Sequence, residues 1–209
     1  MVSDKTIGRI SVYRRLLKEV AAKGETNVFS HQLATMAGCT PAQVRRDVMT
    51  IGYSGSPARG YDVAELIDSI SAVLDPPEHE GIALVGVGNL GRAMLSYFVG
   101  RSPRLAIVAA FDEDPEKVNR VIHGCRCYPV NDMEQVIRER GIREAIIAVP
   151  AAAAQDAARR LVSAGVNGLV NFAPVRLWVP DGVYVENVDV TMALERVAYF
   201  ARERVQERV

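Results

Sequence analysis

The chain has 209 residues, of which 49% are hydrophobic and 24% are charged, as in an ordinary globular protein. It carries 25 basic and 25 acidic side chains, so its formal net charge is zero, which by itself argues against a general binder of polyanions. The three cysteines are too few and odd in number for a disulfide framework, and neither an apolar leader nor a membrane-spanning run is present. These features predict a cytoplasmic protein with one large or two small domains and exclude a disulfide-rich secreted scaffold.

The N-terminal part is predicted to consist of small helices. Apolar residues recur at three- and four-residue intervals over 7–23 and predict a first helix. Ser30 is expected to cap a short second helix that continues to residue 37. Thr40 followed by Pro41 is a strong start signal, a hydroxyl cap with proline at the first helical position, for a third helix over 42–50.

The chain then passes through a turn and a linker. Segment 52–61 is rich in Gly, Ser and Pro and predicts a long turn or hairpin. A fourth amphipathic helix follows over 63–74. Two prolines and three acidic residues make 75–80 a good linker, because they stop a helix and resist burial.

The third helix carries the residue types that recognise DNA. Two short helices joined by a tight connection resemble a helix-turn-helix, whose second helix presents its N-terminal residues to base edges. Arginine is the usual partner of guanine and glutamine that of adenine, while Asp47 could accept from cytosine or hold the arginines in place. The alternative is a small helical cap with solvated arginines. The residues expected at the DNA, with the hairpin as a wing, are Ser30, Pro41, Ala42, Gln43, Arg45, Arg46, Asp47 and Arg59.

The zero net charge is the sum of two opposed parts. Residues 1–61 hold nine basic and four acidic side chains, a net charge of +5, whereas residues 62–209 hold 16 basic and 21 acidic ones, a net charge of −5. The helical part is therefore basic and suits a DNA partner.

After the linker, apolar strands alternate with helices, which predicts a parallel α/β sheet. The strands are expected at 82–85, 105–111, 145–149, 169–172 and 183–185. The helices between them are expected near 90–99, 133–140 and 151–164, and a charged amphipathic helix begins at about residue 191.

The clearest motif, Gly86-Val-Gly88-Asn-Leu-Gly91, lies between a predicted strand and a predicted helix. In this context the first glycine allows a tight turn, the second lets the backbone approach a pyrophosphate, and the third lets helix and strand pack closely. Asp112 follows the next strand, 21 positions after Gly91, near the distance expected for a ribose-binding carboxylate. Glu113 and Asp114 add two further acids that would repel a 2′-phosphate, so we expect NAD(H) rather than NADP(H). A glycine turn that binds nothing, or another nucleotide such as coenzyme A, is the alternative.

Other motifs give weaker evidence for a function. Cys125-Arg-Cys127 has no second Cys/His pair at zinc spacing, so we expect no metal site and interpret this segment as a loop or strand edge.

A dehydrogenase needs a catalytic acid or base and a place for its substrate. The 110 residues from 81 to 190 suit a nucleotide-binding domain and little else, and no catalytic His, Lys or Tyr stands out. A ligand-sensing DNA-binding protein explains both halves. A small NAD-dependent oxidoreductase and a coenzyme A-binding module are the rival interpretations.

Several motifs in order resemble the Rex family of redox-sensing transcriptional repressors over essentially the full length. They are Gln43-Val-Arg-Arg-Asp47, the glycine motif 86–91, Phe111-Asp112-x-Asp-Pro115, Ala148-Val-Pro150, Asn171-Phe-Ala-Pro174 and Val185-Glu-Asn-Val-Asp189. The resemblance implies a homodimer that binds a palindromic operator and is released by NADH. It also implies a winged helix-turn-helix domain (1–78), a Rossmann NAD(H)-binding domain (79–190) and a C-terminal dimerisation helix (191–209) exchanged between protomers.

The resemblance also implies roles for individual residues. The residues expected at NADH or NAD+ are Gly86, Val87, Gly88, Asn89, Leu90, Gly91, Asp112, Val149, Pro150 and Val190. Asp189 matches a family aspartate that pairs with an arginine of the first helix, here Arg15, and Tyr97 matches a tyrosine of the same switch. Two departures stand out. Family wings often carry Gly-Lys-Arg-Gly where this chain has Gly-Ser-Pro-Ala at 55–58, and some members have phenylalanine in place of Val190.

Overall fold

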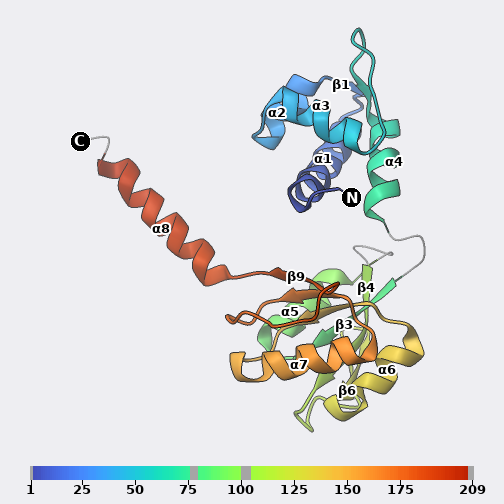
Figure 1. Cartoon of the computed structure of the whole chain (residues 1–209), viewed down its shortest axis with the longest axis vertical. Coiled ribbons are helices and arrows are strands. Elements are labelled where there is room, and N and C mark those ends of the chain that lie inside the picture. The colour runs from blue at the N-terminus through green and yellow to red at the C-terminus, as the bar shows by residue number, and fades with distance from the viewer. Residues whose placement is uncertain (1, 76–79, 100–104, 207–209) are drawn as a thin grey trace. The chain divides into compact units, whose positions relative to one another are not determined.

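The computed structural model describes residues 2–75, 80–99 and 105–206 (Figure 1). The chain divides into two units, residues 1–77 and 78–209. By its contacts the C-terminal segment 191–209, predicted as a separate part, is counted with the second unit.

The first unit begins with a long helix and continues through shorter ones. In chain order its elements are α1 (Asp4–Ala22), β1 (Asn27–Val28), α2 (Ser30–Ala37), α3 (Pro41–Thr50), β2 (Tyr61–Asp62) and α4 (Val63–Leu74). At the start of α1, α3 and α4, a side-chain oxygen accepts a hydrogen bond from the backbone N–H three residues later; these capping residues are Ser3, Thr40 and Asp62. Thr40 and Pro41 therefore act as predicted.

One buried face from each helix forms the core of this unit. On α1 the buried residues recur at helical spacing and include Ile10, Tyr13 and Leu17, none of which exposes any surface. They pack with buried residues from the other helices and strands, namely Val28, Leu33, Ala34, Val44, Val48, Tyr61, Val63, Leu66 and Ile70. The helices are thus held together by a single apolar cluster.

A hairpin follows α3, as predicted, and extends away from the helices in Figure 1. Ser56 and Gly60 exchange backbone hydrogen bonds of 2.8 and 2.7 Å near its tip, and at its base β2 pairs antiparallel with β1. Gly60 has a φ of +75°, and a Cβ there would lie 2.5 Å from the carbonyl oxygen of Val28. Glycine is therefore needed where the hairpin rejoins the helices.

The second unit alternates strands and helices. Its elements are β3 (Glu80–Val85), α5 (Asn89–Phe98), β4 (Leu105–Asp112), β5 (Val121–Ile122), β6 (Cys125–Pro129), the 3₁₀ helix η1 (Val130–Asp132), α6 (Met133–Arg140), β7 (Glu144–Ile147), α7 (Ala151–Ala164), β8 (Gly168–Asn171), β9 (Tyr184–Asn187) and α8 (Val190–Gln206). The strands form one sheet in the order β5-β6-β4-β3-β7-β8-β9. All neighbours pair parallel except β5 and β6. The predicted parallel α/β sheet is confirmed.

Helices cover both faces of this sheet, α6 and α7 on one and α5 on the other (Figure 1). Successive residues of β3 alternate between the two cores: Ala83 and Val85 face α6 and α7, whereas Ile82 and Leu84 face the α5 side. The chain adds β4 on one side of β3 and later adds β7 on the other side, so the strand order reverses at β3. Such a switch point leaves a crevice at the carboxyl ends of the strands.

One segment differs in part from the prediction. Residues 125–127, interpreted as a loop or strand edge, belong to strand β6, which pairs with β5 at the edge of the sheet, and Cys125 and Cys127 lie in the core on the α5 side with 5% and 0% exposure. Helix α8 is present as predicted, and every residue from Val190 to Glu203 is exposed.

Candidate functional site

The glycine motif connects β3 to α5 and each glycine meets a different constraint. Gly86 has a φ of +95°, and a Cβ there would lie 2.6 Å from the carbonyl oxygen of Ala148. A Cβ on Gly91 would overlap the carbonyl oxygen of Gly86. Gly88 caps α5, and a Cβ there would meet no atom within 4 Å. Close packing therefore explains why Gly86 and Gly91 are glycines. At Gly88 the space in front of the N-terminus of α5 is open.

A cavity of about 370 Å³ opens at this switch point. Its wall is formed by the carboxyl ends of β3, β4 and β7 with the residues that follow them, by the first residue of η1 and by α7. These residues are Val85, Gly86, Gly88, Phe111, Asp112, Glu113, Lys117, Val130, Ala148, Val149, Pro150, Ala153, Asp156, Ala157 and Arg160. Five predicted cofactor residues lie in this wall: Gly86, Gly88, Asp112, Val149 and Pro150. The other five lie outside it: Val87 and Gly91 are buried behind the loop, and Asn89, Leu90 and Val190 are exposed.

Asp112 holds the glycine loop as well as lining the cavity. One carboxylate oxygen accepts from the backbone N–H of Val87 at 2.7 Å, and the other accepts from that of Asp114 at 2.9 Å. The Lys117 ammonium lies 3.4 Å from both oxygens and 3.2 Å from a carboxylate oxygen of Asp114. Asp112 thus ties the loop to the end of β4.

Lys117 corrects the charge argument made from the sequence. Three consecutive acids were expected to repel a 2′-phosphate, but this ammonium contacts two of them and itself lines the cavity. Burial lowers the pKa of Lys117, yet hydrogen bonds to Asp114 and the charge of Asp112 raise it overall, so the side chain stays cationic. The only sign of this contact in the sequence is that Lys117 follows Asp112 by five residues.

A second cation missed by the sequence analysis, Arg160 of α7, lies at the same cavity. Its Nε and Nη2 donate to the two carboxylate oxygens of Glu134 at 2.7 and 2.9 Å, and Nη2 also donates to the carbonyl of Val130 at 2.8 Å. The hydrogen bonds from Arg160 lower the pKa of Glu134 to about 2. The cavity wall therefore carries fixed charges of both signs.

These residues fit a dinucleotide. The open space at Gly88 lies at the N-terminus of α5, where unpaired N–H groups and the helix dipole favour a phosphate. Apolar side chains such as Val149 and Pro150 line the same cavity and suit an uncharged ring. Gly88 and the N-terminus of α5 would hold the pyrophosphate.

In the first unit, α2 and α3 form a helix-turn-helix. Gly38, with a φ of +65°, ends α2, and Thr40 and Pro41 begin α3 two residues later. On α3, Ala42, Arg45 and Arg46 are exposed. The α3 helix therefore presents two guanidinium groups.

Two further predicted DNA residues lie near this helix. Arg59 is exposed on the hairpin. Ser30 does not cap α2 as predicted: Phe29 occupies the cap position, and its backbone N–H donates to Oε1 of Gln32 at 2.8 Å. The hydroxyl of Ser30 instead accepts from Nη1 of Arg45 at 3.1 Å. This contact restrains one of the two exposed arginines.

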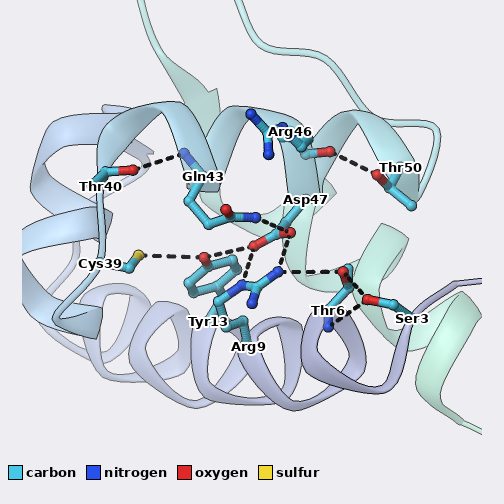
Figure 2. A network of polar contacts seen from close by, with 10 residues as sticks. All are labelled: Ser3, Thr6, Arg9, Tyr13, Cys39, Thr40, Gln43, Arg46, Asp47 and Thr50. Atoms are coloured by element: carbon cyan, nitrogen blue, oxygen red, sulfur yellow. Dashed lines mark hydrogen bonds and ion pairs between the residues drawn. The ribbon is translucent and has the colours of Figure 1, made fainter.

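Asp47 is buried and its prediction as a base contact is wrong. Only 1% of the residue is exposed, because it faces α1 rather than solvent (Figure 2). Its carboxylate accepts from Nε and Nη2 of Arg9 at 2.6 and 2.8 Å, from the hydroxyl of Tyr13 at 3.0 Å and from Nε2 of Gln43 at 2.8 Å. Burial raises the pKa of Asp47, but the hydrogen bonds from Arg9, Gln43 and Tyr13 outweigh it and the pKa is lowered.

The predicted switch residues belong to different units. Arg15 is exposed on α1, while Tyr97 is 55% exposed on α5 and lies edge-on to Phe98. Asp189 accepts from the backbone N–H of Met192 at 2.9 Å and so begins α8. The ion pair between Arg15 and Asp189 stays a prediction.

Neither a metal site nor a membrane span is found in the described ranges. No group of three or more His, Cys, Asp or Glu side chains within them is arranged to hold a metal ion. Each helix in the same ranges is too short or too polar to cross a bilayer.

The cysteines lie inside the two units. Burial raises the pKa of the Cys125 thiol to about 11 and also raises that of Cys127. Cys39 is half-buried, with its sulfur 3.4 Å from the hydroxyl of Tyr13.

Two family models match parts of the chain. Residues 1–48 match the model described as "Putative DNA-binding protein N-terminus", and residues 78–175 match the model described as "CoA binding domain". The first match covers the helix-turn-helix, and the second covers the glycine loop and the cavity wall.

Curated relatives match over nearly the whole length. A redox-sensing transcriptional repressor Rex from Carboxydothermus hydrogenoformans is 42% identical over 96% of this chain and 97% of its own length. Rex proteins from Syntrophobacter fumaroxidans and Listeria welshimeri are 41% and 38% identical, over 93% and 95% of this chain and 93% of their own lengths.

Solved structures of Rex-family proteins also match this chain. RSP, described as a Rex-family repressor, is 30% identical and superposes over 100% of this chain and 97% of its own with a TM-score of 0.89. Its complex with β-NAD+ and operator DNA gives a TM-score of 0.91 over 96% of that chain, and its complex with β-NADH gives 0.88 over 98%. With this fold, these two sites and these relatives, the chain belongs to the Rex family of redox-sensing transcriptional repressors.

Proposed function

We propose that the protein is a transcriptional repressor that binds palindromic operator DNA as a homodimer and leaves it when NADH fills the cavity at the glycine loop. One observation carries this proposal: the same chain holds a helix-turn-helix with exposed arginines and a cavity at the glycine loop. The Rex family consists of transcriptional repressors rather than enzymes, and RSP has been solved with NADH and with NAD+ plus operator DNA.

In the proposed DNA complex, α3 enters the major groove. Arg45 and Arg46 are the exposed cations of this helix and would contact guanines, and Gln43 would contact adenine. Pro41 and Ala42 at its N-terminus would lie against the DNA backbone. The hairpin would approach the neighbouring minor groove with Arg59 as its single cation.

In the proposed nucleotide complex, the loop 86–91 holds the pyrophosphate at the N-terminus of α5. Asp112 lies beside the adenosine ribose, and Val149 and Pro150 border the nicotinamide. The bound group supplies a ring that is cationic when oxidised and neutral when reduced. An apolar wall favours the neutral ring, which supports a response to NADH.

Release from DNA requires that NADH bind one arrangement of the dimer more tightly than the other. Arg15 and Asp189 have opposite charges and match the family's switch positions, so their ion pair would exist in one arrangement only, with Tyr97 beside it. The exposed apolar side chains of α8, among them Val190, Leu194, Val197 and Phe200, suit burial against a second protomer. Val190 would then approach the partner's nicotinamide.

Because bacterial operators lie in the cytoplasm, we place the protein there.

The deciding experiment is a fluorescence-anisotropy titration of a labelled operator, repeated with NADH, NAD+, NADPH and coenzyme A. We expect tight binding that NADH alone relieves. A protein that ignores DNA and binds coenzyme A would be the coenzyme A-binding module, consistent with the match over residues 78–175. Hydride turnover with any substrate would favour the oxidoreductase and contradict the proposal.

A further inference from the structure

The amide of Gln43 has only one orientation that its surroundings accept. Its Nε2 donates to Oδ1 of Asp47 at 2.8 Å, one helical turn further along α3 (Figure 2). An ionised carboxylate can only accept hydrogen bonds, so the nitrogen of the amide must face it. The reversed amide would set its oxygen against a negatively charged oxygen.

Asp47 is itself held in place by α1. Arg9 donates to both carboxylate oxygens and Tyr13 to one of them, and the Asp47 side chain is 2% exposed. The same hydrogen bonds lower the pKa of Asp47, which keeps the group ionised and acceptor-only at neutral pH. The tether of Gln43 is therefore anchored outside α3, on a different helix.

A fixed amide selects between bases. Glutamine recognises adenine by accepting from the N6 amine while donating to N7, and this leaves the second hydrogen of Nε2 for another acceptor. A free amide can turn over and present its nitrogen to the acceptors N7 and O6 of guanine. Tethering the nitrogen removes this second mode and leaves the first.

We propose that Asp47 is a positioning residue for base recognition: by fixing the amide of Gln43 toward α1, it makes Gln43 select adenine over guanine. The inference rests on the proposed function, since it needs an operator. Asp47 does not touch DNA in this arrangement, and Arg9 and Tyr13 act through it.

The test compares affinities for paired operators. The operator is selected from random duplexes, and each position is then changed in one of its two half-sites, so that one base contact changes at a time. At the position recognised by Gln43, wild-type protein is expected to prefer adenine to guanine by about 5- to 150-fold, the range of one bidentate base contact. Asp47→Asn, whose amide can face Gln43 with either atom, is expected to lower this preference about 5-fold or more. In a Gln43→Ala background, Asp47→Asn should leave the ratio unchanged.

The ratio separates positioning from a merely structural role, because partial unfolding weakens binding to both operators equally. Glu139→Gln is the matched control: Gln135 donates to Oε1 of Glu139 at 2.7 Å, also from four residues earlier on a helix, but this pair lies on α6 of the second unit, so the adenine preference should not change. If Asp47→Asn does not fold, Tyr13→Phe removes one hydrogen bond to Asp47, and we expect it to lower the ratio about 2-fold or more.

The inference is overturned if the adenine-to-guanine ratio is the same in wild type and in the folded variant, or if no operator position depends on Gln43. Failure of the proposed function looks different: wild-type protein would bind no operator, or NADH would not release it.

Discussion

Replacement of Glu134 by glutamine should remove stability from the second unit in a way that depends on pH. The pKa of Glu134 is about 2, against an ordinary 4.5, because Arg160 donates two hydrogen bonds to it. This difference corresponds to about 3 kcal/mol at 1.36 kcal/mol per pH unit. Because the two side chains are 24% and 27% exposed and glutamine keeps one acceptor oxygen, we expect Glu134→Gln to cost about 2 kcal/mol at pH 7.

The sign of the pH dependence follows from the lowered pKa. A carboxylate that titrates lower in the folded protein stabilises the fold above its ordinary pKa, and this stabilisation disappears as pH falls from about 4.5 toward 2. About half or more of the difference between wild type and Glu134→Gln should thus be lost by about pH 3. Other acidic groups, such as Asp47, titrate in both proteins and cancel in the comparison.

Urea unfolding followed by circular dichroism at several pH values measures this difference. Glu116→Gln is the matched control, since its pair with Arg120 is 3.5 Å long and the two side chains are 83% and 63% exposed. It should change stability by less than about 0.5 kcal/mol at every pH. A Glu134→Gln difference that is absent at pH 7, or equal at pH 7 and pH 3, would refute the assignment of the low pKa to Arg160.

The other predictions concern the two sites and the proposed switch. Gly91→Ala should destabilise the protein because its Cβ overlaps Gly86, whereas Gly88→Ala should keep its melting temperature and lose NADH affinity about 10-fold or more, measured by calorimetry. Arg46→Ala should abolish operator binding in anisotropy while NADH still binds; retained DNA affinity would remove α3 as the recognition helix. Asp189→Asn should alter the release of operator by NADH with NADH affinity broadly unchanged, and normal release would exclude the ion pair with Arg15.

Features with a local signal could be predicted from the sequence. Thr40 and Pro41 start a helix wherever they occur together before a helical pattern, and the structure confirms α3 within one residue. The glycine motif was equally predictable, because the positive φ at Gly86 and the close contact of Gly91 with Gly86 both belong to a single strand–turn–helix unit.

Features that depend on distant partners could not be predicted. Asp47 shares the buried face of Val44 and Val48, so its spacing contained a signal for burial. A carboxylate at such a position is stable only with donors, and these come from Arg9 and Tyr13, 38 and 34 residues earlier. Nothing local identifies them.

Lys117 and the Cys-x-Cys segment were not predicted, although both have local signals in the sequence. Lys117 contacts two acids only because the turn after β4 brings it back to them. Cys125 and Cys127 alternate with the exposed Arg126, which is the pattern of a strand, but three residues are too short a run to distinguish a strand from a loop.

The burial of these two cysteines decides which oxidants the protein can report. A thiol reacts with peroxide as the thiolate, and at neutral pH a group with a pKa near 11 is almost entirely protonated. Cys125 and Cys127 are also shielded by the sheet and α5. Under the proposed function, peroxide would leave these two thiols unmodified, and the protein would follow the reducing power of metabolism through its dinucleotide while staying insensitive there to a burst of oxidant.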